Sequence, residues 1–422
     1  MILRQIIPWQ DIITQLTEFY SNDRGRIGKP LRVMVALLIL SRLRSLSDQE
    51  VVKQVKENRY MQYFCNVPDC ELADFVNPSL LCRFRQRLGA KGAAIIETAV
   101  FDSLCKPGAV KGDTLMMDST VLSSNIIYPT DVILLHKAFG KMEIFADNHN
   151  ISLWWDKSHL KKRWLAYNKA KKGQKVAFLT EFYALFTPAL QTFGCHVESL
   201  KTDTEAPDSS KSKAHELLSL LTLLSDQTRQ KLAGERHIDN RIVSLDEVDA
   251  RPIKKGKTFP PCEFGTTLQM SFNRQGFMVT TQNFIGKHND SSLYESTLKL
   301  HQERMNGNSD NLDTIVADLG FRSRKNRKNT PESISNLFLG RTDDVDESHQ
   351  AFCCKARSAT EGFIAVAKNW RGFGRSLYAG FNGDRIWTLL CQTAYNLKKF
   401  LQLYRKGELD SHCLEALGLL TP

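Results

Sequence analysis

The chain has 422 residues, of which 42% are hydrophobic and 24% charged, and its formal net charge is +11. This length and composition exclude a short peptide or a disordered tail and allow two or three domains, while the positive charge favours a polyanionic partner. Ten cysteines without a CxxC pair, and an N-terminus without the uncharged apolar stretch of a signal peptide, exclude a disulfide-rich secreted protein and indicate a cytoplasmic one.

Residues 1–110 are predicted to form an all-helical domain. The segment Leu31–Leu43 is rich in strong helix formers, and its apolar run Val33–Leu40 is too short to span a bilayer, so we expect no membrane role. The sequence Ser47–Glu50 has the pattern of a capping box, which predicts the start of the next helix.

A further helix is predicted from Asn77-Pro78 to a stop at Gly89. Basic residues occupy alternate positions in it and therefore spread over more than one helix face: Arg83, Arg85 and Arg87. Some of them must therefore point to solvent or to phosphate, and a solvated basic helix in a packing domain is the alternative.

Residues 111–405 are predicted to form a second domain that begins with a strand at Asp113–Val121. The continuous apolar run before Asp118 is typical of a central strand covered on both faces. A basic helical insertion is expected at about 131–236, and it carries aromatic residues that suit either core packing or base stacking: Trp154, Trp155 and Trp164.

After the insertion, the pattern predicts a hairpin of Thr267–Phe272 and Phe277–Gln282, then a helix ending near Met305. A short buried strand, Thr314–Ala317, follows and is terminated by Asp318, and a last helix runs from Gly383 to about Tyr404. The βββαβ order with an inserted helical block predicts an α/β fold with a ribonuclease H-like core, a mixed sheet flanked by helices. Residues 406–422 are expected to be a C-terminal tail.

Three carboxylates are the candidate catalytic and metal-binding residues: Asp118, Asp318 and Glu361. An Asp at the end of each of two buried strands, joined by a Glu from a helix, can gather oxygen ligands around Mg²⁺. Arg357 and Lys368 share a helix face with Glu361 and are candidate phosphate contacts, or else partners of nearby acids. Rival carboxylates are Asp113 and Asp131 for the first position, Asp313 for the second, and Glu332 or Glu347 for the third.

A dense basic run follows Asp318 and is interpreted as a loop that binds DNA phosphates beside the carboxylates, with a solvated charge run as the alternative. Its basic residues are Arg322, Arg324, Lys325, Arg327 and Lys328.

Several short motifs together resemble the DDE transposases of bacterial insertion sequences, especially the InsH-like group of insertion-sequence family five. The family signature is Tyr-x2-Arg-x3-Glu-x6-Lys, and the chain matches it at Arg357, Glu361 and Lys368 but has Cys354 at the Tyr position. The other matching motifs are Met117–Thr120, Tyr128–Asp131, Arg251–Ile253, Gly256–Lys257, Glu263–Gly265 and Ala317–Phe321.

The resemblance implies a transposase that binds the terminal inverted repeats of its element and cleaves and transfers DNA strands. It further implies two Mg²⁺ ions, for which Mn²⁺ substitutes, at Asp118, Asp318 and Glu361, with residues 1–110 binding DNA. A homodimer on DNA, target DNA as a second partner and association with the nucleoid are also expected. The alternatives are an inactive or domesticated DNA-binding derivative and a metal-dependent nuclease without transfer activity.

Overall fold

The computed structural model describes residues 2–21, 28–68, 75–203, 207–254, 262–305 and 312–419, and none of the helices in these ranges is both long and apolar enough to cross a membrane. The chain forms two compact units. Unit 1 comprises Met1–Asn125 and Ile253–Pro422, and unit 2 comprises Ile126–Pro252. The predicted Gly256–Lys257 motif lies outside the described residues.

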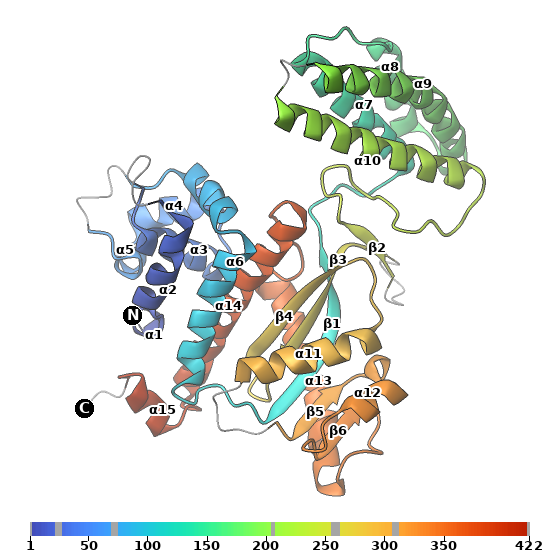
Figure 1. Ribbon diagram of the computed structural model, residues 1–422. Helices are drawn as coiled ribbons and strands as arrows, with labels where there is room; N and C mark the ends of the chain where they lie inside the picture. Colours follow the sequence, from blue (N-terminus) through green and yellow to red (C-terminus); the bar gives the residue numbers. More distant parts are fainter. Residues whose placement is uncertain are drawn as a thin grey trace. The chain divides into compact units, whose positions relative to one another are not determined.

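A mixed β-sheet forms the centre of unit 1 (Figure 1). Its strands lie in the order β2-β3-β1-β5-β6, and β4 pairs with β3 off this path. The pairs β4–β3 and β3–β1 are antiparallel, whereas β1–β5 and β5–β6 are parallel. The predicted hairpin is confirmed as β3 and β4. The strand bounds are β1 Thr114–Ser123, β2 Arg251–Ile253, β3 Glu263–Phe272, β4 Met278–Ile285, β5 Thr314–Ala317 and β6 Asn336–Leu339.

Helices cover both faces of this sheet. Odd-numbered residues of β1 and β5 pack against α11 (Asp290–Met305), whereas even-numbered ones pack against α13 (Glu347–Trp370) and α14 (Gly380–Lys406). This alternation follows from the two-residue period of a strand. The β1 and β5 strands are therefore apolar on both faces, as their continuous apolar sequences predict.

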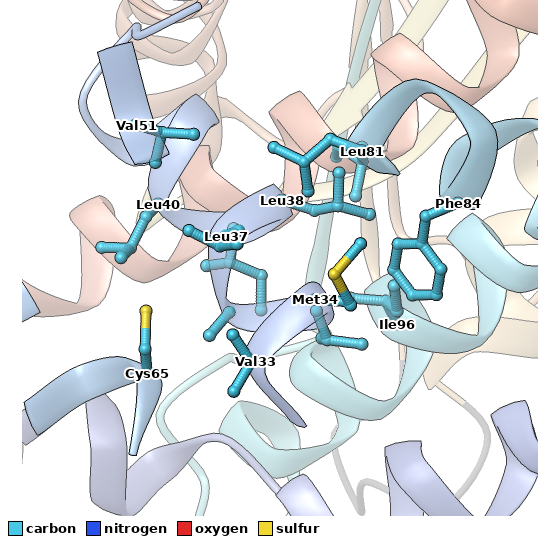
Figure 2. Close-up of a cluster of buried hydrophobic side chains, with 14 of the residues drawn as sticks. Val33, Met34, Leu37, Leu38, Leu40, Val51, Cys65, Leu81, Phe84 and Ile96 are labelled. Atoms are coloured by element: carbon cyan, nitrogen blue, oxygen red, sulfur yellow. The ribbon is translucent and has the colours of Figure 1, made fainter. Parts of the chain in front are cut away.

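The N-terminal helices of unit 1 pack around a core that they share with α14. Figure 2 shows part of this core, where Met34, Leu37 and Leu38 of α3 meet Leu81 and Phe84 of α6. The predicted capping box is confirmed at the start of α4, since Ser47 and Glu50 each bond the other's backbone. The bounds are α1 Ile2–Ile6, α2 Trp9–Leu16, α3 Leu31–Leu43, α4 Asp48–Glu57, α5 Arg59–Cys65 and α6 Pro78–Cys105.

The helix stop predicted at Gly89 is confirmed as an interruption of α6. Gly89 has a φ of 58° and a ψ of −165°, which is not helical, so the helix that begins at Pro78 is interrupted there and a second helical segment follows as far as Cys105. This second segment buries Ala93, Ile96 and Val100 in the N-terminal core, a contact that local sequence does not reveal.

Unit 2 has its own hydrophobic core, formed by the helices of the predicted helical insertion. Trp154 and Trp155 meet edge to face at 4.9 Å, and Trp164 stacks on His136 at 4.2 Å. All three tryptophans are partly buried against this core, which favours packing over base stacking. The bounds are α7 Asp131–Asn148, α8 Lys157–Lys169, α9 Lys175–Thr202 and α10 Asp208–Leu232.

Candidate functional site

Asp118 lies in the middle of β1, at the point where the neighbouring parallel strand ends. The register pairs Met116 with Val316, and continuing it by two residues places Asp318 next to Asp118. Asp318 comes directly after the last residue of β5. The two aspartates therefore lie at the carboxyl end of the parallel strands, which is where open α/β sheets place their ligands.

The side chain of Asp118 belongs to the sheet face covered by α13. Met116, two residues earlier on β1, packs in one cluster with Cys353 and Ala356 of that helix. Because strand side chains alternate, Asp118 faces the same helix. Helix α13 also carries Arg357 and Glu361. The fold thus brings all three predicted carboxylates to one end of the sheet.

Arg357 lies between two of these carboxylates. Its Nη1 atom is 3.0 Å from Glu361 Oε1, one helical turn away, and its Nη2 atom is 3.8 Å from Asp318 Oδ2. The Glu361 side chain is 66% exposed, whereas that of Arg357 is 24% exposed. The Nη1 atom is buried and makes no well-aligned hydrogen bond. The guanidinium thus offsets the charge of both acids, and its Nη1 group has an N–H donor that is not used in a hydrogen bond.

The chemistry of this donor set fits Mg²⁺, which prefers carboxylate oxygens. Within the described ranges, however, no group of three or more His, Cys, Asp or Glu side chains is arranged to hold a metal ion. With Arg357 at 3.0 Å from Glu361, a metal ligand role for Glu361 requires its side chain to turn toward Asp118 and Asp318.

Asp290 is a further carboxylate at this end of the sheet, and the sequence analysis missed it. Its Oδ1 atom accepts a 2.5 Å hydrogen bond from Ser119 Oγ, next to Asp118 on β1. A Cβ on Gly320 would lie 2.9 Å from Asp290 Oδ2 and 3.0 Å from Asp318 Oδ1, so both carboxylates crowd the same glycine. The sequence signal for Asp290 was an acid in the first turn of a helix. Acids are favourable at that position in helices generally, so this signal did not point to a functional site.

Lys368 is held by an acid at the start of β3. Its ammonium nitrogen is 3.3 Å from Glu263 Oε1, and both side chains are less than one-fifth exposed. The alternative role considered for Lys368, pairing with a neighbouring acid, is thus the one seen in this structure.

The predicted basic loop after Asp318 is instead the short helix α12 (Arg324–Asn329), because Ser323 caps it by accepting a hydrogen bond from the Asn326 backbone. Acids offset much of its charge. The pairs are Arg322–Asp343 at 2.6 Å, Lys325–Glu295 at 3.3 Å and Arg327–Asp344. Arg324 and Lys328 line an open groove beside α12 together with Arg327.

The three arginines at the start of α6 differ in their surroundings. Arg85 is buried, donates two hydrogen bonds to Asp48 at 2.8 and 2.7 Å, and stacks on Tyr378. Arg83 and Arg87 are exposed, and Arg87 lies 4.6 Å from the ring centre of Tyr20. Arg85 is therefore engaged within the fold, and the two exposed arginines are the better candidates for DNA contacts.

The rival carboxylates occupy other places. Asp113 pairs with Arg274 at 3.0 Å, and Asp131 pairs with Arg241 at 2.6 Å within unit 2. Asp313 precedes β5, at the opposite end of that strand from Asp318.

The two rivals for the third position also lie elsewhere. Glu347 is the first residue of α13, roughly 21 Å along the helix axis from Glu361. Glu332 lines the groove beside α12.

Comparisons with known proteins give two matches. The model of a transposase domain (DUF772) matches residues 1–87. The curated protein "Uncharacterized protein ORF8 in nfe locus" of Rhizobium meliloti is 30% identical over 164 residues, which are 38% of this chain and 79% of that protein. No solved structure matches the chain.

Proposed function

We propose that this chain, which belongs to the family of the Rhizobium meliloti ORF8 protein and carries a match to a transposase domain, is a DDE-type insertion-sequence transposase. It binds the terminal inverted repeats of its element, cleaves DNA there and joins the freed 3′ ends to target DNA. Since transposition joins two ends, two copies of the chain act together on DNA.

The observation that carries this proposal is the meeting of Asp118, Asp318 and α13 at one end of the sheet. Apart from the short strand β2, the elements β1, β3, β4, α11 and β5 follow one another as βββαβ, and this order supports a ribonuclease H-like core. The transposase-domain match covers residues 1–87 and does not include the sheet, so it supports the proposal independently of the carboxylates.

In the proposed mechanism, Asp118, Asp318 and Glu361 would hold Mg²⁺, which would supply activation of an oxygen nucleophile and stabilisation of the departing 3′-oxygen. Asp118 lies on a strand that is paired with β3 at Asp118 itself and with β5 as far as Met116, which suits a fixed position for this acid. Arg357, released from Glu361, donates to a non-bridging phosphate oxygen. Asp290 supports Ser119 and thereby the backbone beside Asp118.

Cys354 occupies the position of the signature tyrosine, three residues before Arg357, and is exposed on α13. It has no phenol to place against a terminal phosphate. We therefore assign contacts with the DNA terminus to the nearby cation Arg357 and to the exposed cations of α12.

The test is cleavage of labelled DNA that carries the gene's own flanking ends, in the presence of Mg²⁺. We expect cuts at the repeat ends by wild type, no cuts by Asp118→Ala or Glu361→Gln, and DNA binding by all three. Glu347→Gln is the matched control because it removes an acid from the same helix far from the site; it should cleave like wild type.

Two other outcomes would contradict the proposal, and each would favour a different function. Specific binding without cleavage by wild type would indicate a DNA-binding derivative without activity, which the pairing of Glu361 with Arg357 would then explain. Cleavage of generic DNA with no preference for the repeats would indicate a nuclease without transfer activity.

A further inference from the structure

A basic groove with a cavity volume of about 770 Å³ lies in unit 1 between the N-terminal helices and the C-terminal half of α14. None of the described residues that line it is acidic. Tyr60, Tyr63 and Tyr404 contribute aromatic surface, and Tyr60 is 80% exposed. The cations that line the basic groove are Arg4, Arg44, Arg371, Lys398, Arg405 and Lys406.

Four of these six cations are not neutralised by an acid within the described residues, although Arg371 donates a hydrogen bond to the backbone carbonyl of Trp370. Arg4 bonds the backbone carbonyl of Tyr63, and Lys406 pairs with Glu408 at 3.3 Å. In contrast, Arg44, Arg371, Lys398 and Arg405 have no acidic partner among the described side chains.

The positive charges that line the groove repel one another, and Lys398 is affected by this repulsion. Burial lowers the pKa of its ammonium, and the nearby charges of Arg371 and Arg44 lower it further. Like charges held together in this way favour an anion that would relieve the repulsion.

The groove is too long for a single phosphate. Lys398 and Lys406 are eight residues apart on α14, which corresponds to about 12 Å of helix. Phosphates of one DNA strand follow one another at about 3.4 Å along the axis. The spacing therefore suits several successive phosphates of a polymer better than one small anion.

The basic groove is also connected to the candidate site by a single helix. Arg371 directly follows α13, ten residues after Glu361, a rise of about 15 Å along the helix. That distance is roughly four base-pair steps of DNA. A duplex whose end lies at the carboxylates could thus continue toward the groove.

We propose that the basic groove binds the phosphodiester backbone of the DNA substrate, inward from the cleaved end. This inference rests on the proposed function, because it takes DNA as the partner. The DNA-contacting surface then includes α14 and the segment after α13, and it is not confined to the transposase-domain match at residues 1–87.

The experiment measures binding of a fluorescein-labelled 30-base-pair duplex by anisotropy at several salt concentrations, using the full chain. The triple variant Arg44→Gln, Lys398→Gln and Arg405→Gln should bind at least about ten-fold more weakly and show a salt slope shallower by about 2.7. The control triple Lys213→Gln, Lys231→Gln and Lys299→Gln removes the same charge from exposed positions outside the groove and should bind like wild type.

Equal affinity and equal salt slope for the groove variant and wild type would overturn the proposal that the groove binds DNA, while leaving the proposed function in place. Absence of DNA binding by wild type would overturn both the proposed function and the proposal that the groove binds DNA. Displacement of the duplex by ATP at a concentration equal to that of the duplex phosphates would show a small-anion pocket and would also overturn the proposal.

A second measurement uses wild-type protein and so does not depend on the folding of a variant. Acetic anhydride labelling followed by mass spectrometry should show that the duplex protects Lys398 and Lys406 several-fold, whereas exposed Lys299 stays equally reactive. Equal labelling of Lys398 with and without saturating duplex would contradict the proposal.

Discussion

Arg304 on α11 donates two hydrogen bonds, 2.6 and 2.9 Å long, to the two carboxylate oxygens of Glu97 on α6. The Glu97 side chain is 1% exposed, and the Arg304 guanidinium also lies 4.4 Å from the ring centre of Phe101. This ion pair joins the N-terminal helical part to the helix that covers one face of the sheet. It connects residues 207 positions apart in the chain.

Removal of one partner should destabilise the whole of unit 1. Glu97→Ala leaves a buried guanidinium without its acid, so we expect the free energy of unfolding in urea to fall by about 3–5 kcal/mol. The double variant Glu97→Met with Arg304→Met removes both charges and should be more stable than Glu97→Ala. A loss below about 1 kcal/mol for Glu97→Ala would show that the pair is not needed.

Acid should destabilise the protein through His301. Burial, with a smaller effect of Arg304, lowers the pKa of His301 to about 3, whereas an unfolded histidine titrates near 6.5. Between these values the unfolded chain binds a proton that the folded chain does not, so stability falls as pH drops below 6.5.

At pH 5 this histidine alone should cost about 2 kcal/mol relative to pH 7. The variant His301→Gln should lose that part of the pH dependence in urea titrations, while the exposed control His412→Gln should keep it. An unchanged pH slope in His301→Gln would contradict the assignment.

Gly320 should be essential for cleavage but not for DNA binding. In Gly320→Ala the added methyl group would press on the carboxylates of Asp290 and Asp318, at 2.9 and 3.0 Å. We expect cleavage to fall roughly ten- to hundred-fold, since small displacements of catalytic groups are costly. Gly362→Ala is the control, because a Cβ there meets nothing within 4 Å although it neighbours Glu361. Equal cleavage by both variants would show that the positions of Asp290 and Asp318 do not matter for cleavage.

The pairing of Lys368 with Glu263 predicts a measurable coupling. Lys368→Gln and Glu263→Gln should each reduce stability, and the double variant should lose less than the sum, with a coupling of roughly 1 kcal/mol or more. If coupling is close to zero and Lys368→Gln weakens DNA binding, then Lys368 contacts phosphate in solution and the pair is not maintained.

Local sequence was enough to predict several parts of this protein. The capping box at Ser47 depends on residues three positions apart, and the hairpin of β3 and β4 depends on alternation and a short turn. The continuous apolar runs before Asp118 and Asp318 indicated central strands. These features follow from neighbours within one strand or one helical turn, so they are encoded in the chain directly.

Contacts between distant segments were decided only by the tertiary structure. Arg85 is engaged by Asp48, the part of α6 after Gly89 buries side chains in the N-terminal core, and Asp290 reaches the carboxylate end of the sheet from α11. The basic groove gathers cations from residue 4 to residue 406. Periodicity carries no information about which of many similar charges and apolar faces will meet, because that choice depends on the packing of whole elements.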